Sequence, residues 1–214
     1  KQQNRRLGLG LMGMGEWFLK RGFPYGSTQI QPWLESYKSR SEHAARSWSN
    51  QLSLPYPVAL RAVAPTGTIS IVGETTSGIE PLFAPAYERR YLTKQGFISE
   101  TIVDPVALRL RDYSLKDNAY SISYADRIAF QAFVQKYVDN SISSTVNLPD
   151  QNTNPSTFGA ELMKHLPNLR GITCFPNGSR GLQPLTIVDF NYAMNKVHKI
   201  DDSDNSCLSG VCSL

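Results

Sequence analysis

Long helical segments alternate with short apolar runs along this chain of 214 residues. The expected helices cover residues 6–21, 27–49, 126–139 and 156–166, and the expected strands cover residues 59–63, 144–148 and 171–175. A helix that connects two strands brings them side by side in parallel. The alternation therefore predicts an α/β architecture with parallel strand pairs.

Three of the expected helices carry individual signatures. Residues 6–21 contain four glycines, which cost helix propensity and therefore require close packing against another element. Ser27 is placed as the N-cap of the second helix, whose aromatic residues recur on one face and are expected in the core rather than in a cofactor-binding box. Asp126 stands near the start of the third helix, where a negative charge is favourable.

Charge and cysteine content limit the possible partners. The net charge is +4, and since the last fourteen residues hold three aspartates and no base, residues 1–200 carry +7. This favours anionic ligands such as nucleotides, whereas the absence of a long basic run argues against nucleic acid. No run reaches the roughly 18 to 20 apolar residues of a membrane span. Three cysteines do not make a secreted disulfide framework, so a cytoplasmic location is expected.

A loop rich in glycine and hydroxyl groups follows the expected strand 59–63. It comprises Thr66–Ser70, in which Gly67 permits close approach of a ligand to the backbone. Backbone N–H groups at a helix start and nearby hydroxyls can hold a phosphate without a lysine, and the Walker A spacing is absent. Spacing alone leaves two readings open, a phosphate loop or an ordinary Ser/Thr-rich turn.

The order of several motifs narrows the choice. They are NRRLGLG (4–10), APTGTIS (64–70), SGIEP (77–81), YERR (87–90), SSTVNLP (143–149), GIT (171–173), GSR (178–180) and a C-terminal cysteine pair. In this order they closely resemble the catalytic subunit of ribonucleotide reductases, most of all the adenosylcobalamin-dependent class. The resemblance extends over nearly the whole chain.

The resemblance implies a fold and an activity. Residues 1–200 would form the C-terminal portion of a ten-stranded α/β barrel, and residues 201–214 a flexible redox tail. The enzyme would be an oxidoreductase that makes deoxyribonucleotides for DNA replication by radical chemistry, with a disulfide as acceptor. The family's radical cysteine lies in an Asn-x-Cys-x-Glu finger loop, which this sequence lacks. The chain is therefore expected to be a fragment or split subunit, inactive without the N-terminal half of the catalytic subunit.

The resemblance also assigns the loop to the substrate. The di- or triphosphate of a ribonucleotide would be bound by Thr66, Gly67, Thr68 and Ser70. The Gly78–Pro81 block is expected to be structural, and a buried Glu80 would need a partner that the sequence does not name. Arg89 and Arg90 are expected in structural ion pairs rather than on phosphate.

Cys207 and Cys212 end the chain as a dithiol with four intervening residues. This spacing allows a disulfide, and a pair on a tail suits thiol–disulfide exchange. In the family that it resembles, such a pair re-reduces the active site and is recharged by thioredoxin or glutaredoxin. A metal site, which would need four ligands, and incidental thiols are the alternatives. Cys174 lies in an apolar run and is assigned no role.

One position bears on the cofactor. Reductases that depend on a metal-containing small subunit carry two adjacent tyrosines near the strand at 171–175, whereas this chain has Phe175-Pro176. The resemblance therefore implies adenosylcobalamin, held mainly by the rest of the enzyme, and no metal bound by this chain. Two alternatives remain: a small-subunit-dependent class I reductase with a diverged relay, and a non-catalytic nucleotide- or thioredoxin-binding remnant.

Overall fold

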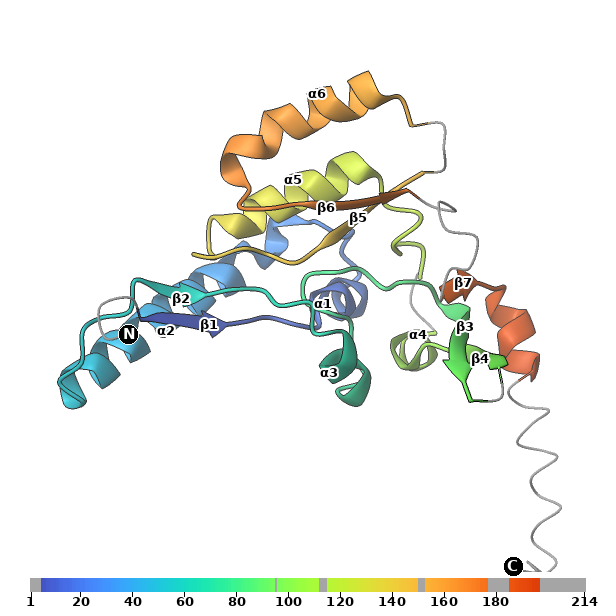
Figure 1. Ribbon diagram of the computed structural model, residues 1–214, viewed down its shortest axis with the longest axis horizontal. Helices are drawn as coiled ribbons and strands as arrows, with labels where there is room; N and C mark the ends of the chain where they lie inside the picture. Colours follow the sequence, from blue (N-terminus) through green and yellow to red (C-terminus); the bar gives the residue numbers. More distant parts are fainter. Residues whose placement is uncertain (1–4, 95, 112–114, 150–152, 177–184, 197–214) are drawn as a thin grey trace, which may run out of the picture.

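The computed structural model describes residues 5–94, 96–111, 115–149, 153–176 and 185–196 (Figure 1). Its α-helices are α1 (Met14–Arg21), α2 (Gln31–Gln51), α3 (Gly67–Val72), α4 (Pro105–Arg109), α5 (Tyr124–Gln135) and α6 (Pro155–His165). Its strands are β1 (Arg6–Leu9), β2 (Ala59–Arg61), β3 (Ala86–Thr93), β4 (Gly96–Val103), β5 (Thr145–Leu148), β6 (Thr173–Pro176) and β7 (Leu185–Ile187). Short 3-10 helices, Thr28–Ile30 and Leu166–Asn168, adjoin α2 and α6.

Four strands run in parallel, as the alternation of helices and strands predicts. β1 pairs with β2 and β5 pairs with β6, both in parallel. A parallel bridge between Val63 and Ile142 joins the two pairs just beyond β2 and just before β5. The spatial order is therefore β1-β2-β5-β6, with a helical crossover between each strand and the next.

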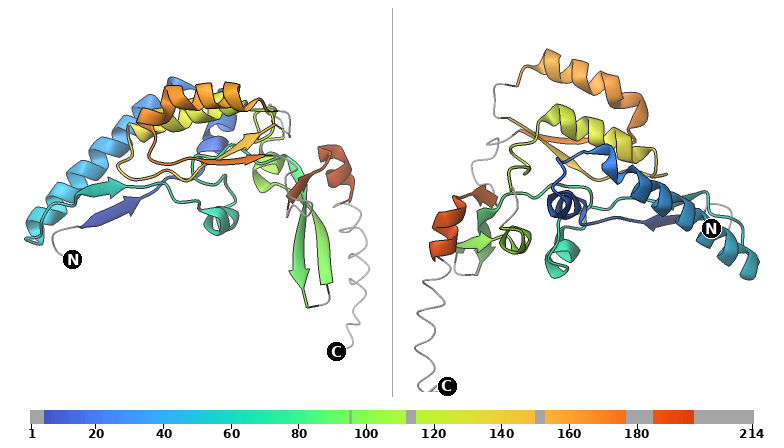
Figure 2. Two further views of the ribbon diagram at one scale, coloured as in Figure 1. Left: turned by 45° about the horizontal axis from the view of Figure 1, so that its top comes forward. Right: turned by 180° about the vertical axis from the view of Figure 1, so that it is seen from behind.

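The long helices cover one side of this parallel run. Figure 2 shows α2, α5 and α6 on one side of the strands and the short α3 on the other. Helices that are confined to the outer side of parallel strands are the arrangement found in α/β barrels, whereas open doubly wound sheets are covered on both sides. The side that carries α3 is therefore the inner side, where loops after the strands can meet a ligand.

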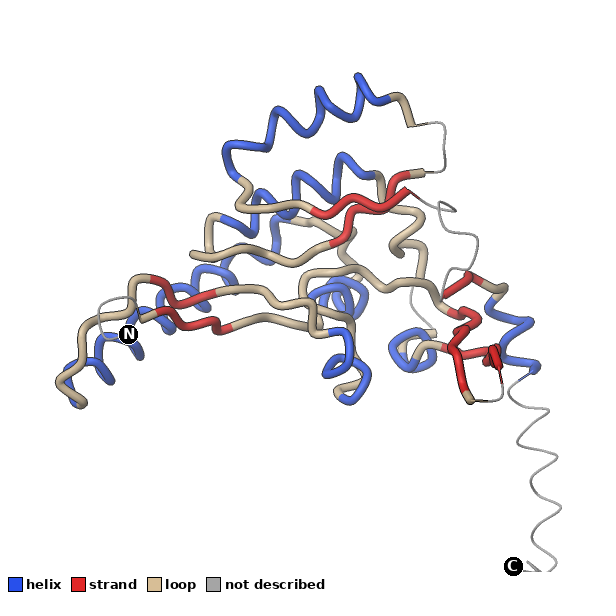
Figure 3. The backbone as a smooth tube through the Cα atoms, viewed as in Figure 1, coloured by secondary structure: helices blue, strands red, loops and turns tan. Residues whose placement is uncertain are grey.

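A second, antiparallel sheet stands apart from the parallel strands (Figure 3). Its order is β4-β3-β7, and β3 and β4 form a hairpin with Ala86 opposite Val103 and Thr93 opposite Gly96. The sequence analysis did not predict this hairpin. Half of the residues in each strand are exposed, and neither strand shows the continuous apolar run by which the buried strands were recognised.

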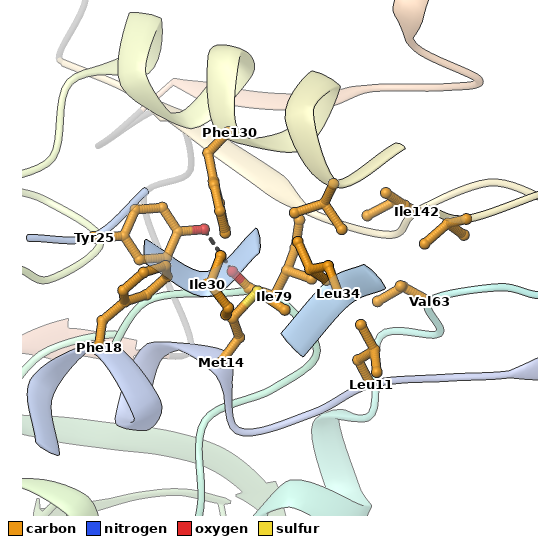
Figure 4. Close-up of a cluster of buried hydrophobic side chains, with 12 residues drawn as sticks. Leu11, Met14, Phe18, Tyr25, Ile30, Leu34, Val63, Ile79, Phe130 and Ile142 are labelled. Atoms are coloured by element: carbon orange, nitrogen blue, oxygen red, sulfur yellow. Dashed lines mark hydrogen bonds between the residues drawn. The ribbon is translucent and has the colours of Figure 1, made fainter. Parts of the chain in front are cut away.

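The main core lies where α1, α2 and α5 meet (Figure 4). Its rings are Phe18, Tyr25 and Phe130, which contact one another edge to face at centroid distances of 4.9 to 5.5 Å. Aliphatic side chains complete the cluster, among them Ile30 and Leu34, which are almost completely buried. Edge-to-face packing of this kind adds to the stability that comes from burial alone.

Two expectations for the N-terminal half are wrong. The helix expected over residues 6–21 begins at Met14, because residues 6–9 form β1 instead. The main chain of this segment bonds to β2, and Gly13, at φ 83°, separates strand from helix. Trp33 and Trp48 are not core residues, since they are 46% and 60% exposed.

The other predicted helices are confirmed with small changes at their ends. Ser27 caps the 3-10 turn that leads into α2, its hydroxyl accepting a hydrogen bond from the Gln29 N–H. Asp126 lies in the first turn of α5, as predicted. Within the described part of the chain, no helix combines the length and apolar character needed to cross a membrane.

Candidate functional site

The predicted phosphate loop leads directly into α3. Thr66 precedes the helix in the left-handed region at φ 52°, and its carbonyl accepts a hydrogen bond from the Ser70 N–H at 2.8 Å. Its hydroxyl Oγ1 accepts a bond from the Gly78 N–H at 2.8 Å. The loop is therefore tied to the chain segment that follows α3.

Ser70 makes a second tie to that segment. Its side chain is buried, and its hydroxyl lies 3.1 Å from the Gly67 carbonyl and 2.9 Å from the Ser77 hydroxyl. Thr68 is exposed. The loop thus holds two hydroxyls in internal bonds and presents a third to solvent.

An open cleft of about 610 Å³ lies beside the loop. Its walls come from the loop, from residues 75–83, from the hairpin and α4, and from the start of β5. The lining residues are Pro65, Gly67, Ser70, Ile71, Thr75, Thr76, Ser77, Glu80, Pro81, Leu82, Phe83, Tyr87, Asp104, Ala119, Ser143, Thr145, Asn147 and Leu185. Of the predicted phosphate-binding residues, Gly67 and Ser70 line the cleft, whereas Thr66 and Thr68 are not among the lining residues.

The polar groups of the cleft wall are hydroxyls, the Asn147 amide and two carboxylates, and they lie among apolar side chains such as Leu82 and Phe83. Among the described residues that line it, none carries a basic side chain. Asp104 also caps α4, since its Oδ1 accepts a hydrogen bond from the Val106 N–H at 2.8 Å. Burial raises the pKa of Asp104, and the backbone N–H bonds offset part of that rise. A phosphate here would have to be held by N–H and hydroxyl donors.

An aromatic group forms the wall nearest the hairpin. Phe83 contacts Tyr87 and Tyr120 edge to face, at centroid distances of 5.6 and 5.4 Å. Burial, followed by the nearby charge of Asp104, raises the pKa of Tyr87, so its hydroxyl stays protonated. Neither residue was predicted for the site: Tyr87 was noted only as part of the YERR motif, and Asp104 caps a helix that the sequence did not predict.

Glu16 of α1 interacts with the segment that follows α3. Its carboxylate accepts hydrogen bonds from Thr75 Oγ1 at 2.5 Å and from Arg109 Nη2 at 3.3 Å, and it pairs with Lys20 at 3.2 Å. Arg109 also bonds to Glu74 at 3.0 Å. Burial raises the pKa of Glu16, but the hydrogen bonds outweigh it, so the pKa lies below its ordinary value.

Glu80 is half-buried, and the structure supplies a partner for its charge. Arg127 of α5 donates to Glu80 Oε2 through Nη2, and the Thr145 N–H donates to Glu80 Oε1 at 2.6 Å. The same Nη2 donates to the Thr145 carbonyl at 2.6 Å. The only sequence signal for Arg127 was its spacing, since Arg127, Gln131 and Gln135 recur every four residues on one face of α5, and the structure shows that this face is buried.

Comparison with known proteins identifies the fold. The family model described as "Ribonucleotide reductase, barrel domain" matches residues 56–164, which include the loop, Arg127 and every residue that lines the cleft except Leu185. The chain belongs to the ribonucleotide reductase family. It is 26% identical to the putative adenosylcobalamin-dependent ribonucleoside-triphosphate reductase of Mycobacterium phage D29, with 99% of this chain and 37% of that protein aligned.

A second relative and a solved structure are consistent with this family assignment. The vitamin B12-dependent ribonucleoside-diphosphate reductase of Mycobacterium tuberculosis is 28% identical, over 85% of this chain and 32% of that protein. A crystal structure of a B12-dependent class II ribonucleotide reductase superposes with a TM-score of 0.75 at 16% identity, covering 99% of this chain and 36% of that one. The predicted reductase barrel is confirmed. The chain spans about a third of the length of the curated relatives it matches.

Other predicted residues of this ribonucleotide reductase chain have separate outcomes. Arg89 and Arg90 are exposed on β3, and their guanidinium groups lie over the rings of Tyr91 and Phe97 at 5.7 and 4.9 Å. Neither guanidinium forms an ion pair with a described residue, so the expected ion pairs stay a prediction. Cys174 is half-buried on β6, and burial raises the pKa of its thiol.

The tail lies outside the described residues. Cys207 and Cys212 are therefore not placed relative to the cleft, and neither is the GSR segment at 178–180. In the ranges that the structure does describe, no three His, Cys, Asp or Glu side chains gather as metal ligands would. The shuttle role of the two cysteines stays a prediction.

Proposed function

We propose that this chain is the C-terminal part of the catalytic subunit of an adenosylcobalamin-dependent ribonucleotide reductase, acting in the cytoplasm on ribonucleoside di- or triphosphates. One observation carries the proposal. The Thr66–Ser70 loop adjoins a cleft of about 610 Å³ on the inner side of a reductase barrel. A cleft of this size is in the range that small ligands occupy.

In this proposal the loop binds the substrate phosphates. Gly67 has no atom within 4 Å of where a Cβ would stand, so a ligand can approach the backbone closely. The exposed Thr68 hydroxyl and the first N–H groups of α3, which have no carbonyl partner within the helix, are available as donors. Hydrogen bonds from neutral donors to an ionised phosphate are shorter and stronger than hydrogen bonds between two neutral groups.

The cofactor proposal rests on relatives and on β6. Relatives that align with most of this chain are named as dependent on adenosylcobalamin or vitamin B12, a cofactor that supplies a radical when bound. Phe175 and Pro176 on β6 cannot act as a tyrosine relay. We assign the binding of the cofactor mainly to the rest of the enzyme. If turnover of the complete enzyme required a di-metal partner subunit instead, the class I alternative would hold.

The loop is tested by replacing a single hydroxyl. Thr68→Val keeps the shape of the side chain and removes a donor. A hydrogen bond to a charged group is worth about 1.5 to 3 kcal/mol, so the KM for ribonucleotide in the complete enzyme should rise on the order of tenfold or more. Thr157→Val, at an equally exposed threonine on α6, should leave the KM unchanged. An unchanged KM in Thr68→Val would contradict the phosphate role.

The tail is tested by separating two sources of electrons. In this proposal, Cys207 and Cys212 re-reduce the active-site disulfide and are recharged by thioredoxin or glutaredoxin, through exchange of one disulfide for another. Replacing both with Ser should abolish thioredoxin-driven turnover, while a small dithiol should restore it. Cys174→Ser should keep both activities. Thioredoxin-driven turnover by the double variant would overturn the assignment.

A further inference from the structure

Glu80 is a carboxylate in the wall of a cleft proposed to hold a polyanion. An unpaired negative charge there would repel phosphate. Arg127 neutralises it, with its own side chain 1% exposed and that of Glu80 24% exposed. The pair therefore removes the repulsion without contributing a basic side chain to the cleft wall.

Stability alone does not account for this ion pair. Nε and Nη1 of Arg127 are buried and have no hydrogen-bond partner among the described residues. Buried ion pairs with unsatisfied donors commonly stabilise a fold less than apolar side chains of similar volume. We therefore explain the ion pair by the relative positions that it imposes on the two segments that it joins.

The pair joins two walls of the cleft. One wall is the Thr76–Pro81 turn that carries Glu80, and the other is the start of β5 at Thr145. Glu80 accepts the Thr145 N–H at 2.6 Å while Arg127 donates to the Thr145 carbonyl at 2.6 Å, so both polar groups of this residue are held. A shift of Glu80 would therefore move both walls.

The same turn is hydrogen-bonded to the predicted phosphate loop. Its Gly78 N–H donates to the Thr66 hydroxyl at 2.8 Å, and its Ser77 hydroxyl contacts the Ser70 hydroxyl at 2.9 Å. Gly78 can make this contact because it adopts φ 45° and fits against the Ala64 carbonyl, which a Cβ would approach to 3.3 Å. Glu80 is thus connected to the loop through two hydrogen bonds.

Packing around the turn leaves it little freedom. Gly15 of α1 lies so close that a Cβ there would be 2.5 Å from the Glu80 carbonyl. Tyr25 donates a hydrogen bond to the Ile79 carbonyl at 2.5 Å (Figure 4), and its ring lies 5.5 Å from the Arg127 guanidinium. The turn is therefore clamped between α1 and α5.

We propose that Glu80 is a positioning residue for the substrate phosphates, holding the Thr66–Ser70 loop at a set distance from the start of β5 through Arg127. This inference rests on the proposed phosphate role of the loop. Glu80 itself need not touch the substrate, and it acts through the turn. A hydrogen-bonding group displaced by about 1 Å no longer lies within hydrogen-bond distance of the phosphate, so substrate binding should weaken.

The test uses inorganic pyrophosphate as a competitive inhibitor of the complete enzyme. Glu80→Gln keeps the size of the side chain and removes the charge that holds Arg127. It should raise both the inhibition constant of pyrophosphate and the KM for ribonucleotide on the order of tenfold, with a smaller change in kcat. Glu161→Gln, which loses an exposed pair with Lys164 on α6, should change neither constant.

A double-mutant cycle between Glu80 and Thr66 of the loop distinguishes a positioning role from a purely structural one. Thr66→Val removes the acceptor of the Gly78 N–H, further along the same path. Because Thr66→Val and Glu80→Gln break one chain of contacts, their combined effect on pyrophosphate should be smaller than the product of the single effects. Fully multiplicative effects would overturn the inference.

The remaining outcomes separate the two proposals. If Glu80→Gln leaves an uncompensated charge and does not fold, the double variant Glu80→Gln/Arg127→Met removes both charges and should show the same weakened pyrophosphate inhibition. A wild-type inhibition constant in Glu80→Gln or in the double variant would overturn the inference. If pyrophosphate does not compete in the wild type and Thr68→Val has no effect, the proposed phosphate role fails first.

Discussion

At the scale of single residues, carboxylates hold the segments around the cleft in place. The Glu16 carboxylate interacts with Thr75, Lys20 and Arg109. The Glu80 carboxylate interacts with Thr145 and Arg127. Both carboxylates are remote in sequence from most of their partners. Because each accepts several hydrogen bonds, removing one carboxylate releases more than one segment.

The Glu16 group predicts a pH dependence. The folded chain holds the pKa of Glu16 below its ordinary value of 4.5, so between the two values the unfolded chain binds more protons. The stability that Glu16 contributes is therefore present above about pH 4.5 and lost as the pH falls through the folded pKa. Glu16→Gln should cost roughly 1 to 2 kcal/mol at neutral pH and make acid unfolding less steep.

Acid unfolding followed by the fluorescence of the tryptophans, one of which is the neighbouring Trp17, measures this effect. Glu35→Gln, at an exposed carboxylate on α2, is the matched control and should leave the curve unchanged. Identical acid slopes for the wild type and Glu16→Gln would show that the Glu16 hydrogen bonds do not stabilise the fold.

At the scale of elements, the predictions succeeded where a segment shows its own period. α5 was predicted because apolar residues recur at helical spacing, and its buried face also includes Arg127, Gln131 and Gln135. The β3–β4 hairpin was missed because its strands are half exposed and show no apolar period. β1 was mistaken for helix, because its pairing with β2 depends on residues about fifty positions away.

The start of α5 gives a prediction at this scale. The Ser123 hydroxyl accepts the Asp126 N–H at 3.1 Å and donates to the Asp126 carboxylate at 2.6 Å. Ser123→Ala should destabilise the helix by about 1 kcal/mol. Hydrogen exchange should speed up in the first turn of α5, which carries Arg127. Ser39→Ala, on the exposed face of α2, should have no such effect, and equal exchange in both variants would refute the cap.

At the scale of the whole molecule, one apolar cluster joins the helices on the outer side of the barrel to the segments that carry the cleft. Ile79 belongs to this cluster and immediately precedes Glu80, while Val63 lies between β2 and the loop. The core and the proposed site are therefore adjacent along the chain. A change in core packing should reach the cleft through these two segments.

Leu34 tests the cluster, since it is completely buried between α2 and its neighbours. Leu34→Ala should lower the free energy of unfolding by about 2 to 5 kcal/mol. Met163→Ala, at a side chain on α6 that is 65% exposed, should change it by no more than about 0.5 kcal/mol. Urea denaturation of the two variants compares them directly, and equal midpoints would show that this cluster is not the stabilising core.

Residue patterns were enough to predict the parallel α/β class, the place of the loop after β2 and the resemblance to ribonucleotide reductases. Those features are local, since a helical period or an ordered motif is complete within its own segment. The pairing of Arg127 with Glu80, 47 positions away, and the shared cleft of Asp104 and Tyr87 became visible only in the folded chain. Such pairings depend on how elements that are distant in the sequence pack together, and no local residue pattern encodes that packing.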